Sequence, residues 1–216
     1  MNSVYAKKYL IPAGILISLL LLFIATTRYP GGSLFDRNSI GFDWSKNFIS
    51  NLFGAKAVNG QDNPARIWAD AGMMILSLSF SLFFISYSKR IPVKSAGKVI
   101  RFSGVAGMFC TALIVTPLHD IMVTISSTLF LVSIFYITVF ILKSRLHLFK
   151  IFCLISLLIF YYTLYLYGAG KFGTLPVMQK ITFFSMILLV LGLQFFTKKE
   201  DFTSPKKSIT VDSFNI

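Results

Sequence analysis

The feature that most constrains this chain is a series of six long apolar segments separated by shorter polar connections. Each approaches the ~20 apolar residues that a helix needs to cross the hydrocarbon core of a bilayer. Because a bilayer offers no water to backbone groups, such segments are expected to be helical. The sequence therefore predicts an all-α, polytopic integral membrane protein, a bundle of six transmembrane helices. The expected spans are about 9–27, 64–88, 99–116, 121–142, 148–167 and 175–196.

Composition supports the same fold class. Only 13% of the 216 residues are charged, whereas soluble domains carry about a quarter. We expect one six-span membrane domain over residues 1–197. The remaining residues, 198–216, are polar and charged, and they predict a disordered cytoplasmic tail.

The positive charge is distributed as in a membrane protein. Of the 21 lysines and arginines, 14 lie in the amino terminus, the second and fourth connections and the tail. Cytoplasmic loops carry the excess of basic residues, so both termini are predicted to be cytoplasmic in a multi-pass protein of the cell (inner or plasma) membrane. Nucleic acid is not an expected partner, because the spans leave no domain that could bind it.

The first outer connection, between residues 28 and 70, is the longest polar interval between two spans. Asp43 is placed to cap a short amphipathic helix over Trp44–Phe53, which Gly54 would end. Such a helix would lie on the bilayer or act as a lid across the mouth of the bundle. Asn63, followed by Pro64, has the residue types that begin a helix.

Polar side chains are predicted to gather near the outer ends of the second, third and fourth spans. The candidates for ligand binding are Arg66, Asp70, His119, Asn51 and Lys171, because cations and amides can hold a lipid headgroup. The candidates for acid–base or nucleophilic chemistry are His119, Asp120, Asp70 and Ser50. A purely structural alternative is that Arg66 and Asp70 pair with each other, or with His119, and fasten helix ends.

No metal site and no cofactor are expected. Catalytic zinc takes three protein ligands, and the chain has only two histidines, of which His147 belongs to the opposite side of the membrane.

The segment from Phe48 to Gly72, read together with residues 117–120, resembles a family of small six-span bacterial and archaeal membrane proteins. That family has no known function and is distantly similar to the DRAM/Frag type of membrane protein. The matching positions are Ser50, Asn51, Arg66 and His119, whereas Phe53 before Gly54 and Asp120 after His119 depart from the pattern. The resemblance implies six helices and an outward first loop, and it implies no reaction.

Three functions remain open at this stage. The leading hypothesis is a non-enzymatic module that binds a lipid or small amphiphile in an outer-facing pocket. The alternative is an intramembrane lipid hydrolase that uses His119 with Asp70 or Asp120, and the third is a small transporter. Membrane lipids are the expected partners, and small residues at intervals of four could let two copies of the chain pack together: Ser103, Gly107 and Thr111.

Overall fold

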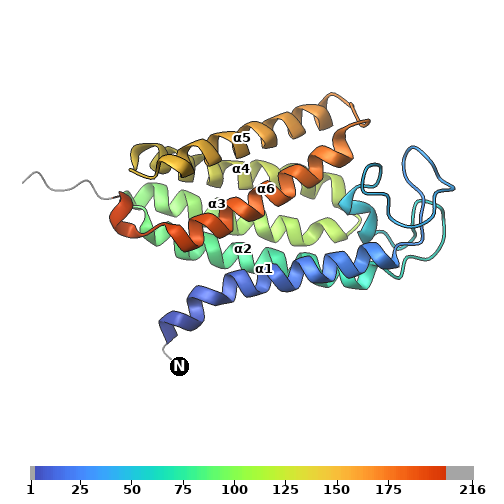
Figure 1. Cartoon of the computed structure of the whole chain (residues 1–216), viewed down its shortest axis with the longest axis horizontal. Coiled ribbons are helices and arrows are strands. Elements are labelled where there is room, and N and C mark those ends of the chain that lie inside the picture. Colours follow the sequence, from blue (N-terminus) through green and yellow to red (C-terminus); the bar gives the residue numbers. More distant parts are fainter. Residues whose placement is uncertain (1–2, 203–216) are drawn as a thin grey trace, which may run out of the picture.

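The computed structural model describes residues 3–202, which form six long helices and contain no strand (Figure 1). All six are long and apolar enough to cross a membrane. Their bounds are α1 Ser3–Arg28, α2 Arg66–Tyr87, α3 Lys94–Ala112, α4 His119–Lys143, α5 His147–Gly168 and α6 Leu175–Phe196.

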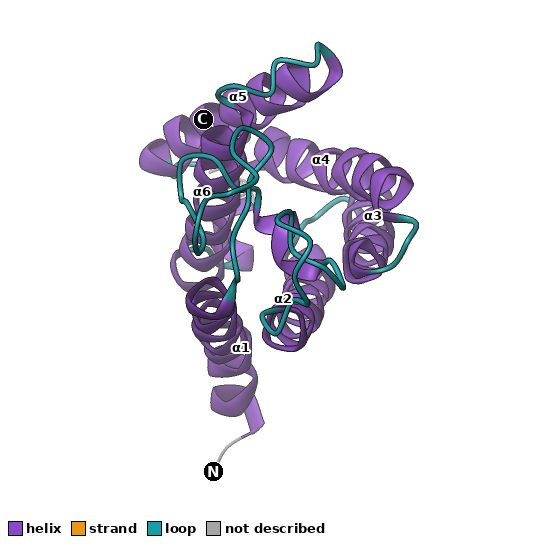
Figure 2. Ribbon diagram, turned by 90° about the vertical axis from the view of Figure 1, so that its right-hand side faces the viewer, coloured by secondary structure: helices purple, strands orange, loops and turns teal. Residues whose placement is uncertain are grey.

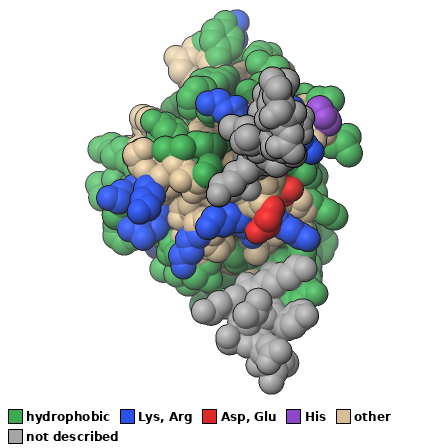
Figure 3. Space-filling view, turned by 90° about the vertical axis from the view of Figure 1, so that its left-hand side faces the viewer, with side chains coloured by type: hydrophobic (Ala, Val, Ile, Leu, Met, Phe, Trp, Pro, Cys, Tyr) green, Lys and Arg blue, Asp and Glu red, His purple; other side chains and the backbone are tan. Residues whose placement is uncertain are grey.

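The helices run along the long axis of the molecule, so the chain has two ends with different chemistry (Figure 1). One, here called the loop end, carries residues 29–65, 113–118 and 169–174. The other, the basic end, carries residues 88–93, 144–146 and 197–202. Figure 3 views the basic end, where lysines and arginines gather on the surface beside visible acidic side chains.

Small residues let neighbouring helices approach closely. The Ser18 hydroxyl of α1 donates a hydrogen bond to the Gly72 carbonyl of α2 over 2.7 Å. A Cβ at Gly104 of α3 would lie 2.2 Å from the ring of Phe84, so only glycine fits there. In Figure 2, viewed from the loop end, α2 lies between α1 and α3, and α4 lies beside α3.

The face predicted to join two copies packs inside the chain instead. Ser103 of α3 lies 2.6 Å, hydroxyl to hydroxyl, from Ser133 of α4. A Cβ at Gly107 would lie 3.1 Å from the backbone nitrogen of Phe130, also in α4. Any oligomer would therefore have to use another face.

The start of α3 also differs from the expected span, because the helix begins at Lys94 rather than near residue 99. Lys94 and Lys98 occupy its first turns with exposed side chains. Long basic side chains can reach water from the end of an apolar helix, so the helix extends beyond the apolar run. A 3₁₀ turn, Leu113–Val115, continues its other end.

The helix in the first connection is shorter than the predicted Trp44–Phe53. Asp43 does cap a turn, because its Oδ1 accepts bonds from the backbone nitrogen and hydroxyl of Ser45 at 2.8 and 2.6 Å. The backbone is then extended at Phe48, whose nitrogen donates to Asn51 Oδ1 over 2.8 Å. Only the 3₁₀ helix η1, Ile49–Phe53, follows, and its apolar side chains are buried against the bundle rather than presented to lipid.

The rest of this connection is a folded cap rather than an open loop. The Tyr29 hydroxyl donates to the Gly32 carbonyl and accepts from the Val58 nitrogen. Burial raises the pKa of Tyr29, although the bond from Val58 opposes the shift. Gly32 has φ +81°, and a Cβ there would lie 2.3 Å from the Asn59 nitrogen, which requires glycine at this point.

At the basic end, Arg90 joins α2 to the last turn of α6. Its guanidinium donates to the carbonyls of Leu193 and Thr197 at 2.9 Å each, which satisfies carbonyls that a helix end leaves free. The chain then forms a 3₁₀ turn, Lys199–Phe202. Most of the tail predicted to be disordered, residues 203–216, lies outside the described residues.

Candidate functional site

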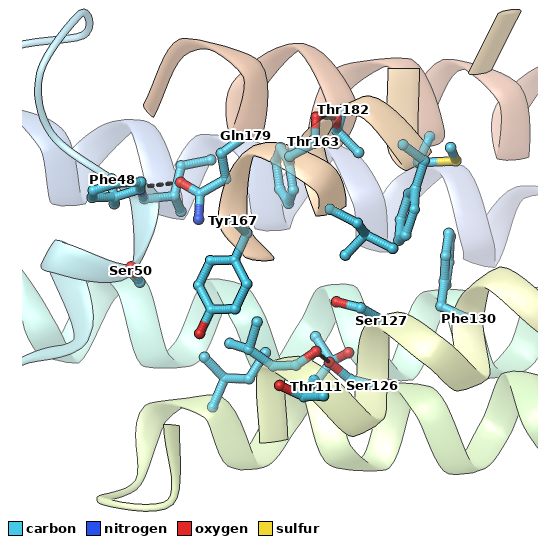
Figure 4. A pocket seen from close by; sticks show the side chains of 18 of the residues that line it. Phe48, Ser50, Thr111, Ser126, Ser127, Phe130, Thr163, Tyr167, Gln179 and Thr182 are labelled. Carbon is cyan, nitrogen blue, oxygen red and sulfur yellow. Dashed lines mark hydrogen bonds between the residues drawn. The ribbon is translucent and has the colours of Figure 1, made fainter. Parts of the chain in front are cut away.

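A cavity of about 670 Å³ lies in the loop-end half of the bundle (Figure 4). Five helices, α2 to α6, form its walls, and η1 covers it from the loop end. Sites for small organic ligands typically measure about 300–1,000 Å³, so the space suits a ligand of that size.

Stacked aromatic rings close the cavity toward the basic end. The ring of Phe130 on α4 lies between those of Phe80 on α2 and Phe160 on α5, with centroids 6.1 and 5.9 Å away. The planes differ by only 22° and 18°, so the three rings form one column. This column gives the cavity an apolar floor.

Two neighbouring residues of α6 hold the cover in place. The Ile49 nitrogen donates to Gln179 Oε1 over 2.8 Å, the dashed line in Figure 4. The Lys180 ammonium donates to the carbonyls of Asn47 and Pro176 and lies 5.6 Å from the centre of the Phe42 ring. Lys180 is only 7% exposed, so its ammonium holds the first connection and is not available to a ligand.

The cavity wall is largely apolar, with a few neutral polar groups. Among the described residues that line it, none is Lys, Arg, Asp or Glu. Some of the hydroxyls are satisfied within the protein, such as those of Thr163 and Thr182, which lie 2.7 Å apart.

Among the fully buried polar atoms of the lining residues, two have no partner in the described part of the chain: Ser77 Oγ and His119 Nε2. Ser77 is 4% exposed. A buried polar atom without a hydrogen bond costs about 1–3 kcal/mol. Both atoms are therefore places where a ligand's polar group would gain a bond.

The structure divides the predicted site residues into two groups. Ser50 and His119 line the cavity. Arg66 and Asp70 instead form an ion pair on α2, Nε to Oδ2 at 3.4 Å, as the structural alternative held. In the described residues, neither makes a hydrogen bond or ion pair with His119, and neither lines the cavity.

The remaining candidates lie at the edge of the site or outside it. Asn51 Oδ1 is engaged by the backbone of Phe48, and Lys171 is exposed with its ammonium 3.2 Å from the Tyr165 hydroxyl. Asp120 Oδ1 lies 2.9 Å from His119 Nδ1 and is in contact with the site only through that ring.

Sequence reasoning missed three residues that shape the site: Ser77, Gln179 and Lys180. A lysine inside an otherwise apolar span was a usable signal, because charged residues there are rare and need partners. Ser77 and Gln179 gave no such signal, since serine and glutamine also occur in spans as helix-packing residues.

Over the described residues, no group of three or more histidines, cysteines or acidic residues is placed to hold a metal ion.

Compared with known proteins, the chain matches no family model, no curated protein and no solved structure. The family resemblance of residues 48–72 and 117–120 therefore stays an expectation. The geometry of the site is the basis for a functional assignment.

Proposed function

We propose that this chain is an integral membrane protein whose loop-end cavity binds a lipid or other amphiphile without transforming it. The observation that carries the proposal is the unpartnered Ser77 hydroxyl in the wall of a largely apolar, ligand-sized cavity. An amphiphile would fill the apolar volume and supply a polar partner.

The exposed surface of the helices supports a membrane location. Large apolar side chains are exposed along the middle of the helices, among them Leu20, Leu78, Phe102, Phe109, Leu158 and Leu188. Soluble monomers rarely expose apolar area of that extent. With the basic end in the cytoplasm, the charge pattern satisfies the rule for membrane orientation.

The position of the cavity mouth supports a ligand that arrives from the bilayer. Thr124 and Thr128 of α4 and Tyr167 of α5 line the cavity and are also exposed, so it reaches the surface between these two helices. In a bilayer this opening would face acyl chains in the outer half.

Orientation can be tested with single cysteines in a background that lacks Cys110 and Cys153. Gln61→Cys is at the loop end and Ser95→Cys is near the basic end, and both positions are exposed. A membrane-impermeant maleimide should label Gln61→Cys on intact cells and Ser95→Cys only after permeabilisation. Labelling of both on intact cells would contradict the topology.

Binding can be tested by native mass spectrometry of protein released from mild detergent. The wild type should carry a stoichiometric amphiphile, and Ser77→Leu, which fills the cavity wall, should lose it. Ser86→Leu, on the same helix but away from the cavity, is the matched control and should retain it. A wild type that carries none, and takes up none when lipids are added, would refute the proposal.

The hydrolase remains a second candidate because of one observation. Asp120 contacts His119 Nδ1, and the buried Nε2 of this cavity-lining residue has no partner among the described residues. That nitrogen could take a proton from water as the water oxygen attacks an ester carbonyl, and return it to the departing alcohol when the C–O bond breaks. Asp70, paired with Arg66, has no part in this arrangement.

Binding ranks first because the Asp120 side chain is 86% exposed, so water competes for the contact that would orient the imidazole. The hydrolase predicts that proteoliposomes release fatty acid from ester lipids and that His119→Ala stops the release while lipid is still bound. Absence of release by the wild type would remove this candidate.

A further inference from the structure

The charge of the cavity wall bears on which amphiphile fits. Three cationic residues near the site are engaged elsewhere: Arg66 with Asp70, Lys171 with Tyr165, and Lys180 with backbone carbonyls. A phosphate or carboxylate placed in this cavity would leave water without gaining a cationic partner, which is strongly unfavourable. The wall therefore favours an uncharged head.

The amide of Gln179 supplies a hydrogen-bond donor. Because its Oε1 accepts from the Ile49 nitrogen, the orientation of the amide is fixed and its Nε2 is directed away from the cover. In Figure 4 this nitrogen points into the cavity, toward Tyr167, and within the described residues it has no hydrogen-bond partner.

The imidazole of His119 supplies an acceptor. Its Nδ1 lies 2.9 Å from a carboxylate oxygen of Asp120, and an ionised carboxylate can only accept. A neutral ring that donates from Nδ1 to this carboxylate has Nε2 as its acceptor. This atom is buried in the cavity wall and has no partner among the described residues.

We propose that the cavity selects an uncharged lipid with a free hydroxyl, the class of long-chain alcohols and mono- and diacylglycerols, through Gln179 Nε2 and His119 Nε2. A hydroxyl both donates and accepts, so it matches this pair, whereas an ester or ether oxygen only accepts. The acyl chain would lie toward the aromatic floor, with Ser77 available to a second polar group of the lipid. This inference rests on the proposed function and specifies its ligand.

The test compares three probes that share one chain and differ in the head: oleyl alcohol, methyl oleate and oleate. Binding of each to the full chain in nanodiscs is measured by native mass spectrometry at matched probe contents. The alcohol should bind about tenfold more tightly than methyl oleate, as expected for one or two additional hydrogen bonds. Oleate should bind more weakly than the alcohol.

Two variants and one control locate the preference. Gln179→Glu keeps the acceptor for Ile49 and removes the donor, and His119→Phe removes the acceptor while keeping a ring. His119→Phe should reduce the preference for the alcohol over methyl oleate to about twofold or less, because only the hydroxyl can donate to Nε2. Gln179→Glu should weaken the binding of methyl oleate, because the ester can only accept and loses the Nε2 donor. Lys171→Ala, outside the cavity, should change neither the preference nor the binding of the ester. Thermal unfolding of every variant shows whether it has folded.

The outcomes separate the two proposals. If the wild type binds all three probes equally, or prefers oleate, head selection is wrong although the cavity does bind amphiphiles. If no probe binds, the proposed function itself fails. A preference for the alcohol that survives in folded His119→Phe, or binding of methyl oleate that is unchanged in folded Gln179→Glu, would overturn the assignment to these two residues.

Discussion

Asn63 connects the cover of the cavity to the start of α2, and its truncation should destabilise the loop end. The side chain is 7% exposed. Its Nδ2 donates to the carbonyls of Leu52 at 3.1 Å and Gly54 at 2.9 Å, with a longer contact to Asn51, and its Oδ1 accepts from the Ala65 nitrogen at 3.2 Å. Asn63→Ala would therefore leave two carbonyls and one N–H group without a protein partner.

At about 1 kcal/mol for each group, the low end of the range for buried polar atoms, the loss is about 3 kcal/mol. A chain of this length shifts its melting temperature by about 2–4 °C per kcal/mol, so the expected decrease is about 6–12 °C. Unfolding can be followed in a Cys110→Ala background with a thiol-reactive dye, because Cys153 is buried in the folded bundle.

Asn59→Ala is the matched control, because the Asn59 side chain accepts a single exposed bond, from the Gln61 nitrogen. Its cost should be about 0.5 kcal/mol, as for other surface positions. Equal shifts in the two variants would refute the idea that Asn63 holds the cover by its buried hydrogen bonds.

Two further predictions concern packing and pH. Gly104→Ala should destabilise the chain by about 1–3 kcal/mol, because its Cβ would meet the ring of Phe84; Gly168→Ala, with open space around it, should have no such cost in the same thermal assay. The bonds from the hydroxyl and nitrogen of Ser45 hold the pKa of Asp43 below its ordinary value of 3.8. The stability that Asp43 gives to the turn is therefore present above pH 3.8 and lost as the pH falls through the lower pKa of the folded state. Hydrogen exchange should show that protection of the Ser45 amide decreases on acidification. The pH dependence should be weaker in Asp43→Asn.

The number, order and approximate bounds of the six helices could be predicted because the length and apolar composition of each span are enough to identify it. The start of α3 could not, since Lys94 and Lys98 are helical without being apolar. The short helix in the first connection was also misjudged. The side chain of Asn51 bonds the backbone of Phe48, and such local bonds between a side chain and the backbone compete with a regular helix.

The site was harder to predict than the fold because its residues come from many elements that lie far apart in the chain. Placing His119 and Ser50 near the outer ends of the spans was enough to put them at the cavity, where the structure has both. Placing Arg66, Asp70 and Lys171 in the same region suggested a charged pocket. Depth along a helix does not say which way a side chain points, and the ion pair of Arg66 with Asp70 directs both away from the cavity.

Residues that hold the structure together can be distinguished from residues available to a ligand by whether their polar groups already have partners within the protein. The charged side chains near the loop end are engaged: Lys180 with backbone carbonyls and Arg66 with Asp70. The unpartnered groups of the residues that line the cavity, Ser77 Oγ, His119 Nε2 and Gln179 Nε2, are neutral, whereas the unpartnered Asp70 Oδ1 belongs to a residue outside the lining. A pocket built to hold a phosphate would leave a cation free in its wall, whereas here Lys180 holds the cover in place and Arg66 pairs with Asp70. For that reason the unpartnered neutral atoms, rather than the charged residues that stand out in the sequence, indicate the chemistry of the ligand.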